Sequence, residues 1–283
     1  MMRFDIRRLE TTASTNDDAK QAAENGAAEG LVVWALRQSA GRGRQGRVWE
    51  SPEGNLYCSV LLHPPAPVRE WGRYSFVAAL ALYEAVEFYV NGSTRLPSAL
   101  RGGIGEGGGS AQAAVEMIKI APSRTPPPPT PSLKGRGILS AKPVELKWPN
   151  DILVDGKKIS GILLESGEGW LVVGMGLNVR HVPENPLYPV TCLAAETGDV
   201  PSLEEILTKI LESLAAWYQL INTEGFASLR AAWLAHARKG VLRVRLPQEE
   251  IQGQFVDLDR DGNLRLLLAD GRERTISAGD VFF

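Results

Sequence analysis

The pattern of apolar and polar residues predicts strands and helices in alternation through the N-terminal third of the chain. Continuous apolar runs of strand length occur at residues 31–36 and 55–62. Residues 11–26 begin with hydroxyl and amide side chains, carry acids early and end at a glycine, which is typical of a short capped helix. Residues 71–90 carry large apolar side chains on an alanine-rich background, so we expect a buried helix there.

A meander of strands is predicted further along the chain. Residues 144–166 have the pattern of strand, bend, strand, tight turn and strand, with an Asp-Gly hairpin signal at 155–156. The strand predicted at 171–179 contains Gly174 and Gly176 at alternate positions. Because glycine weakens a strand interior, either another group packs flat against this backbone or the strand carries a bulge or a barrel bend.

Short strands at regular spacing end the chain. From residue 240 onward, Asp-Gly pairs separate short apolar segments, which predicts a small antiparallel barrel. Amphipathic helices are predicted before it at 202–224 and 225–236, and we expect both to pack in the core. The chain is therefore expected to divide into a larger mixed α/β (α+β) domain at 1–237 and a barrel domain at 238–283.

The composition changes abruptly inside the larger domain. Residues 91–143 contain nine glycines and eight prolines, including runs of three glycines and of four prolines. This composition is typical of a disordered or low-complexity tract. We interpret about residues 92–143 as an insert, since the entropy of closing a surface loop grows only slowly with its length.

Composition and charge restrict the class of protein. The chain has 283 residues, of which 44% are hydrophobic, and a formal charge of −2, as expected of a soluble globular protein. No apolar run is long enough to cross a bilayer and the N-terminus lacks a signal-peptide core, so we expect a cytoplasmic protein without a membrane partner. Cys58 and Cys192 lie in apolar contexts without metal-ligand spacing and are expected to be buried thiols.

The segment GRGRQGRVW at residues 41–49 carries the strongest candidate chemistry. Glycine lets a backbone approach a ligand closely, and arginine offers a planar fork of donors that matches phosphate oxygens. Arg42, Arg44 and Arg47 thus form a candidate anion site, and Trp49 adds a surface for ring stacking. Arg/Gly tracts also occur in RNA-binding tails. A small-molecule phosphate site is favoured because this tract is short, lies between two strands and belongs to a slightly acidic chain.

Five separated motifs stand out along the chain. They are Ser14-Thr15-Asn16, Gln38 with GRGRQGRVW, KWPND at 147–151, GKKISGILLE at 156–165 and GMGLNV at 174–179. These motifs resemble those of the biotin protein ligases, in the same order. The resemblance implies a mixed-sheet catalytic domain related to class II aminoacyl-tRNA synthetases, followed by an SH3-like β-barrel. It also implies an ATP-dependent ligase that forms biotinyl-5′-adenylate and passes biotin to a lysine of a biotin carboxyl carrier protein, as in acetyl-CoA carboxylase.

The resemblance further implies roles for individual residues. Lys158 and Arg44 are the principal catalytic candidates, with Lys147 and Asp151 near the phosphates, because cations must offset the repulsion between a carboxylate and a triphosphate. The residues expected to bind biotin are Ser14, Thr15, Asn16, Gln38, Gly41, Arg42, Arg44, Lys158, Gly161, Gly174 and Gly176. Those expected to bind ATP or the adenylate are Arg42, Arg44, Arg47, Trp49, Lys147, Asn150 and Asn178. Mg²⁺ is expected to arrive mainly on ATP, with Asp151 as its candidate protein ligand.

The sequence also departs from the family and leaves alternatives open. Thirteen residues precede Ser14, so we expect neither an N-terminal DNA-binding domain nor a DNA partner. A lipoate or octanoate transferase is the enzyme alternative, although those proteins are not expected to combine the GRGRxG loop, KWPND and a C-terminal barrel. A nucleic-acid-binding protein is the alternative from another class, and salt-dependent binding of oligonucleotides without ATP would identify it. The oligomeric state stays open between monomer and homodimer.

Overall fold

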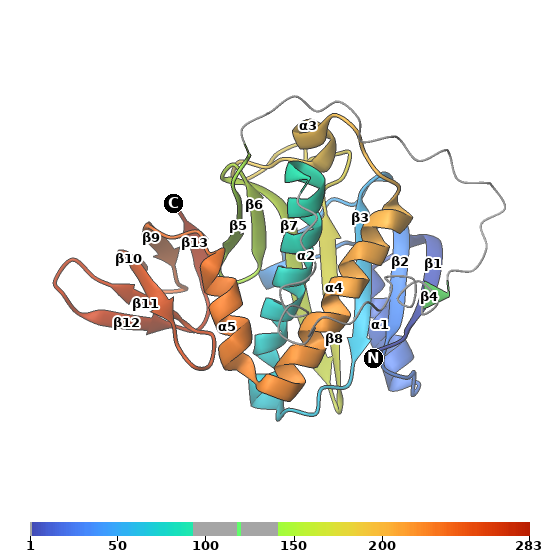
Figure 1. Ribbon diagram of the computed structural model, residues 1–283, viewed down its shortest axis with the longest axis horizontal. Helices are drawn as coiled ribbons and strands as arrows, with labels where there is room; N and C mark the ends of the chain where they lie inside the picture. Colours follow the sequence, from blue (N-terminus) through green and yellow to red (C-terminus); the bar gives the residue numbers. More distant parts are fainter. Residues whose placement is uncertain (1, 93–117, 120–140) are drawn as a thin grey trace, which may run out of the picture.

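An eight-stranded mixed sheet organises the larger part of the protein (Figure 1). The computed structural model describes residues 2–92, 118–119 and 141–283, and within these the sheet order is β4-β1-β2-β3-β8-β7-β6-β5. Its strands are β1 (Phe4–Thr12), β2 (Leu31–Gln38), β3 (Leu56–Leu62), β4 (Ile118–Lys119), β5 (Val144–Lys147), β6 (Asp151–Val154), β7 (Lys157–Gly167) and β8 (Trp170–Leu177). Strand β1 runs parallel to β2 and β4, and the other neighbours are antiparallel. The predicted mixed α/β class is confirmed.

Helices cover both faces of this sheet (Figure 1). The helices are α1 (Thr15–Glu24), η1 (Arg44–Gly46), η2 (Val68–Arg73), α2 (Tyr74–Asn91), α3 (Leu193–Thr197), α4 (Leu203–Glu224) and α5 (Phe226–Ala235). Because side chains alternate along a strand, Val32 and Trp34 join the large core with α2 and α4, while Leu31 and Val33 join a smaller core beneath α1. None of the helices in the described part of the chain combines the length and the apolarity needed to cross a membrane.

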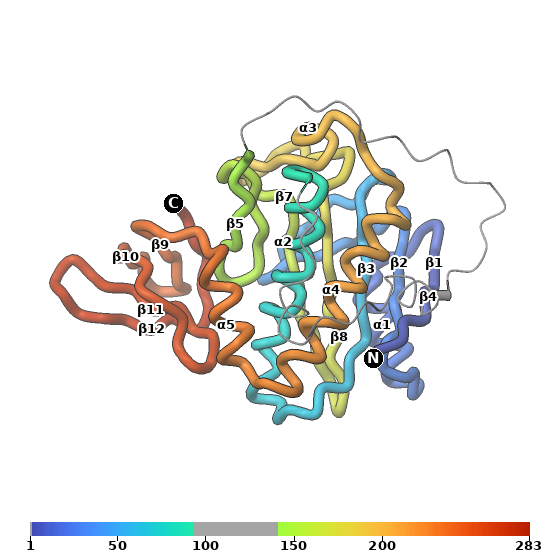
Figure 2. The backbone as a smooth tube through the Cα atoms, viewed as in Figure 1, coloured from blue at the N-terminus to red at the C-terminus, as the bar shows by residue number. Residues whose placement is uncertain are grey.

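A second, antiparallel sheet forms the C-terminal part, as predicted. Its strands are β9 (Val241–Arg245), β10 (Glu250–Leu258), β11 (Leu264–Leu267), β12 (Glu273–Ile276) and β13 (Asp280–Phe282). They are ordered β12-β11-β10-β9-β13, and β13 is a strand that the sequence pattern did not indicate. Figure 2 shows this sheet beside β5, where Leu146 and Ala237 form a parallel bridge. Closure into an SH3-like barrel and the boundary at 237/238 stay predictions.

Several element boundaries differ from those expected. The helix predicted from residue 11 begins at Thr15, because Thr11 and Thr12 extend β1 by pairing with β2. Strand β8 keeps an unbroken register with both neighbours through its glycines, so the bulge interpretation at these positions is wrong. Residues 118–119 of the predicted insert form β4, which pairs with the start of β1; positions 93–117 and 120–140 lie outside the described residues.

Candidate active site

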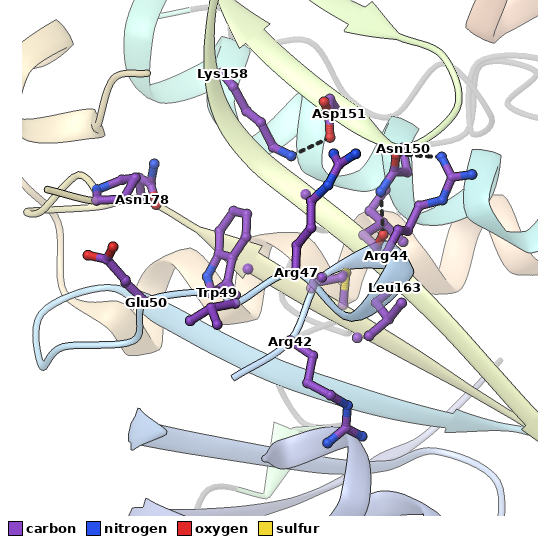
Figure 3. A pocket seen from close by; sticks show the side chains of 18 of the residues that line it. Arg42, Arg44, Arg47, Trp49, Glu50, Asn150, Asp151, Lys158, Leu163 and Asn178 are labelled. Atoms are coloured by element: carbon purple, nitrogen blue, oxygen red, sulfur yellow. Dashed lines mark hydrogen bonds and ion pairs between the residues drawn. The ribbon is translucent and has the colours of Figure 1, made fainter. Parts of the chain in front are cut away.

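A pocket of about 410 Å³ opens on the sheet face that carries α1 (Figure 3). It is lined by the start of α1, loop 41–49, the bend between β5 and β6, β7, β8, the loop that follows β8, and β13 of the C-terminal sheet. Every predicted site residue lines this pocket except Gly41. Motifs spread over the whole chain therefore meet at one place, and both sheets contribute.

One end of the pocket is built from neutral hydrogen-bonding groups. Gln38 Oε1 accepts hydrogen bonds from the backbone N–H and the hydroxyl of Thr15, at 2.9 and 3.1 Å. The Ser59 hydroxyl lies 2.7 Å from Thr15 Oγ1 and 2.6 Å from Asn16 Oδ1. Ser14, at the N-terminus of α1, is buried and makes no capping hydrogen bond with its side chain. This end suits a ligand with an uncharged polar ring.

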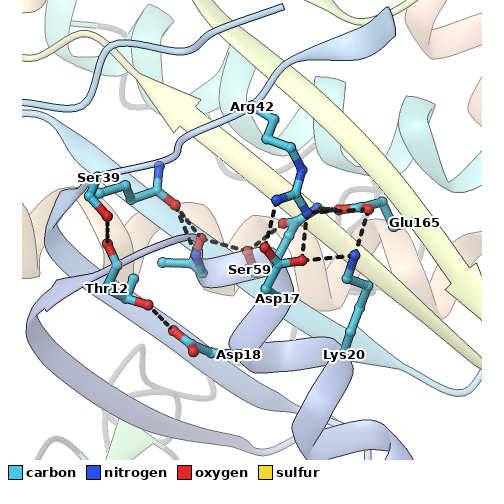
Figure 4. Close-up of polar contacts among 11 residues, drawn as sticks. Thr12, Asp17, Asp18, Lys20, Ser39, Arg42, Ser59 and Glu165 are labelled. Atoms are coloured by element: carbon cyan, nitrogen blue, oxygen red, sulfur yellow. Dashed lines mark hydrogen bonds and ion pairs between the residues drawn. The ribbon is translucent and has the colours of Figure 1, made fainter. Parts of the chain in front are cut away.

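A charged cluster supports the neutral end from α1 and β7 (Figure 4). Glu165 accepts hydrogen bonds from Asn16 Nδ2 at 2.7 Å and from Lys20 Nζ at 2.8 Å. Arg42 donates to both carboxylate oxygens of Asp17, at 2.5 and 2.6 Å, and lies 3.4 Å from Glu165. The hydrogen bond from Arg42 holds the pKa of Asp17 well below its usual range. The Arg42 guanidinium is thus directed to carboxylates of the protein.

The opposite end of the pocket is cationic and buried. Lys158 Nζ lies 2.6 Å from Asp151 Oδ1, and Lys147 Nζ lies 3.4 Å from Asp151 Oδ2. Burial lowers the pKa of Lys147. At Lys158 burial acts in the same direction, but the charge and hydrogen bond of Asp151 together with Tyr188 outweigh it, so the pKa of Lys158 is raised. The Tyr188 ring lies 5.2 and 5.5 Å from the two ammonium groups. Two cations sharing one carboxylate leave this end with a net positive charge.

Loop 41–49 forms a small hairpin over the pocket. Arg42 and Val48 make an antiparallel bridge, and Gly43 N donates to Arg47 O at 2.7 Å. Arg44 Nη1 donates to Asn150 Oδ1 at 3.4 Å, and burial lowers the pKa of Arg44. In Figure 3, Arg44 points towards Asn150 and Arg42 points to the other side of the loop.

A second contact joins the hairpin to the other sheet. Arg47 forms an ion pair with Asp280, which belongs to β13. Within the described residues, Arg44 is the one arginine of the three that makes no ion pair.

The glycines of β7 and β8 admit side chains of the protein itself. A Cβ at Gly174 would stand 2.2 Å from Asn16 Oδ1, and one at Gly176 would stand 2.7 Å from Trp49 Cε2. A Cβ at Gly161 would approach Trp49 Cζ3 to 3.2 Å. The expectation that a group packs against this backbone is confirmed: the amide of Asn16 does so at Gly174, and the indole of Trp49 does so at Gly176. The indole Nε1 is buried against Gly176 and has no hydrogen-bond partner among the described residues.

Two further predicted residues support the shape of the pocket. Asn178 is buried and donates from Nδ2 to Thr191 O at 3.1 Å. Gly41 lies behind the lining, where a Cβ would come within 2.4 Å of Trp49 O, so glycine is needed for the hairpin to fold back on its stem. Both residues shape the pocket through the backbone around them.

Asp151, the candidate protein ligand for Mg²⁺, is already paired with two ammonium groups. Each of its two oxygens faces one of them. Among the described residues there is no group of three or more histidine, cysteine, aspartate or glutamate side chains arranged to hold a metal. Mg²⁺ needs oxygen ligands that are free to coordinate it.

Five residues of this site escaped prediction from the sequence. They are Asp17, Ser59, Glu165, Tyr188 and Asp280. Glu165 ends one of the recognised motifs, and Asp17 directly follows another, so their places in the sequence could have identified both as site residues. Nothing local marks Ser59, Tyr188 or Asp280, because they act through neighbours distant in the sequence.

Comparisons with known proteins agree with this geometry. Residues 8–179 match the biotin/lipoate A/B protein ligase family, and residues 243–283 match the biotin protein ligase C-terminal domain. The chain is 32% identical to the biotin–[acetyl-CoA-carboxylase] ligase of Paracoccus denitrificans over 97% of this chain and 99% of that one. It is similar to the Aquifex aeolicus biotin protein ligase in complex with biotin and ATP, with 25% identity, a TM-score of 0.70 and coverage of 98% and 97%. A Leishmania major biotin protein ligase with biotinyl-5-AMP shows 26% identity, a TM-score of 0.58 and coverage of 97% and 99%.

Proposed function

Because the chain belongs to the biotin/lipoate A/B protein ligase family, we propose that it activates biotin with ATP and transfers it to a lysine of a carrier protein. The observation that carries this proposal is the polarity of one pocket. Its neutral end, at Thr15 and Gln38, suits the ureido ring of biotin. Its cationic end, at Lys147 and Lys158, suits a carboxylate that meets a triphosphate.

The first step forms the adenylate. An oxygen of the biotin carboxylate attacks the α-phosphorus of ATP, the bond from that phosphorus to the bridging oxygen breaks, and diphosphate leaves with the electron pair. Lys158 stays protonated at neutral pH because Asp151 raises its pKa, so it can offset the charge of the carboxylate and of the α-phosphate. Arg44, which forms no ion pair within the described residues, is placed to bind a phosphate oxygen. We place Mg²⁺ on the ATP phosphates and not on Asp151.

The second step transfers biotin. The neutral amine of the acceptor lysine attacks the acyl carbon of biotinyl-5′-adenylate, AMP leaves with the electron pair, and the new amide nitrogen loses a proton. Asp151 has a lowered pKa because it is ion-paired, so it is a weak base. We assign it the task of orienting Lys147 and Lys158. The relative from Paracoccus denitrificans is named for acetyl-CoA carboxylase, which supports a carrier protein of such a carboxylase as the acceptor.

Exchange of radiolabelled diphosphate into ATP tests the first step directly. Biotin, lipoate and octanoate are offered separately, because exchange requires adenylation of the correct acid. We expect exchange with biotin, followed by biotinylation of an added carboxyl carrier domain. Exchange with lipoate or octanoate alone would assign the chain to a related activity of the family, and no exchange with any acid would refute adenylation. Oligonucleotide binding without ATP is the matching test for the nucleic-acid alternative.

A further inference from the structure

The three arginines of loop 41–49 reach three different parts of the protein. Arg42 contacts α1 and β7, Arg44 contacts the bend before β6, and Arg47 contacts β13. The hydrogen bonds inside the hairpin fix its own shape but not its position over the pocket. Gln45 at its tip and Val48 on its returning arm are exposed, so they add little packing. The position of the hairpin therefore depends on Trp49 and on the partners of the arginines.

The partner on the α1 side is Asp17. Its two oxygens accept hydrogen bonds from Arg42 in a bidentate pair, and the same carboxylate lies 2.9 Å from Lys20. Glu165 is the other carboxylate that Arg42 faces, but its nearest oxygen is 3.4 Å away. Bidentate pairs between arginine and carboxylate fix geometry as well as contributing energy. Loss of the Asp17 charge would leave Arg42 with the longer contact alone.

The partner on the other side is Asp280, at the start of the last strand. Its side chain is about a fifth exposed, at 19%, and it accepts a hydrogen bond from Arg47. The residue also lines the pocket. The C-terminal sheet thus reaches the loop through a carboxylate that is 233 positions away in the sequence.

We propose that Asp17 and Asp280 are positioning residues that hold loop 41–49 over the pocket through Arg42 and Arg47, while Arg44 is left to bind the phosphates. This rests on the proposed function, since the retained species is the biotinyl-5′-adenylate. The two anchors lie on opposite sides of the hairpin, so each limits its opening. Their effect is expected on retention of the intermediate, because each carboxylate is paired with an arginine of the loop.

Limited proteolysis of the unliganded protein tests the anchors without reference to catalysis. Trypsin cleaves after arginine, so cleavage at positions 42, 44 and 47, mapped by mass spectrometry, reports how often the loop opens. We expect D17N and D280N each to accelerate this cleavage about five- to tenfold, and D17E to restore most of the protection.

Matched controls separate this effect from a general loss of stability. D18N changes the neighbouring acid, which pairs with Thr12 and not with the loop. D257N removes a carboxylate that joins the C-terminal sheet to Arg230 of α5, away from the pocket. Cleavage in D17N and D280N no faster than in these two controls would overturn the proposal.

A measurement on the wild-type chain covers the case in which a variant does not fold. Salt screens partly exposed ion pairs, so raising NaCl from 0.05 to about 1 M should accelerate loop cleavage relative to a free peptide of the same sequence. Cleavage that is insensitive to salt would count against the anchors.

Release of preformed adenylate then connects the anchors to the reaction. We expect D17N and D280N to release biotinyl-5′-adenylate about five- to tenfold faster than D18N and D257N. If D17N and D280N release adenylate at the control rate although their loops are cleaved faster, the position of the loop does not govern retention of the adenylate, and the proposal is overturned. If the wild-type chain makes no adenylate, the proposed function fails, whereas the proteolysis still decides whether the anchors hold the loop.

Discussion

Replacing Asp151 with asparagine removes the carboxylate shared by Lys147 and Lys158 while almost preserving the shape of the side chain. The Asp151 and Lys158 side chains are 10% and 11% exposed, and the two N–O distances are 2.6 and 3.4 Å. At these distances the attractions amount to about 6 and about 5 kcal/mol for an effective dielectric constant of about 20. In the wild-type protein, the cost of desolvating the charges and the repulsion between the two lysines offset much of this attraction. In D151N the attraction is lost, but the desolvation cost and the repulsion of the lysines remain.

The loss of unfolding free energy in D151N has an upper limit, because a lysine can release its proton when burying its charge would cost more. Breaking a buried ion pair by removing one partner costs about 3–5 kcal/mol. Releasing the proton of a lysine whose ordinary pKa is 10.5 costs about 5 kcal/mol at pH 7. At pH 9.5 the same release costs about 1.4 kcal/mol. We therefore expect D151N to lose about 3–5 kcal/mol of unfolding free energy at pH 7, but about 2 kcal/mol or less at pH 9.5.

Urea unfolding of the wild-type protein and of D151N at the two pH values measures the loss of unfolding free energy at each. In D151N the folded-state pKa of each lysine lies below its unfolded value, so the unfolded chain binds more protons and stability rises with pH. Asp5→Asn is the matched control, because Asp5 is exposed and lies 4.0 Å from Arg7; it should change stability by less than about 0.5 kcal/mol at either pH. A loss in D151N below about 1 kcal/mol, or one that is equal at both pH values, would refute the electrostatic reasoning.

Three further substitutions test the pocket. Lys158→Met should nearly abolish biotin-dependent diphosphate exchange, since it removes the buried cation; exchange at the wild-type rate would remove Lys158 from its role. Arg44→Gly should increase the leak of adenylate, detected as indiscriminate biotinylation of added proteins, because the loop arginine without an ion pair is lost; unchanged retention would contradict this. Gly174→Ala should raise the KM for biotin at least about tenfold, because the new Cβ would stand 2.2 Å from Asn16 Oδ1, and an unchanged KM would show that Asn16 can move without loss.

The sequence correctly predicted turns and strands whose conformation depends on residues that are close together in the chain. The turn at Asp155 and Gly156 has φ values of 49° and 73°, the left-handed conformations that an Asp-Gly hairpin adopts. Strand β8 followed from its apolar run, and the alternate glycines correctly indicated flat packing against its backbone. Strand β13 and helix α3 were not predicted, because they are short and carry little periodicity.

The sequence by itself determined the family, the mixed sheet and those lining residues that belong to the five motifs, because these depend on motif order and on the periodicity of apolar positions. The tertiary structure alone decided how the charged groups pair. Arg47 meets Asp280 across 233 positions, and Asn16 meets Glu165 across 149. An ion pair depends on the distance and exposure of two side chains after the elements have packed, and no local pattern records either quantity. For this reason the three equivalent arginines of one short loop became, in the folded protein, two with carboxylate partners and one without.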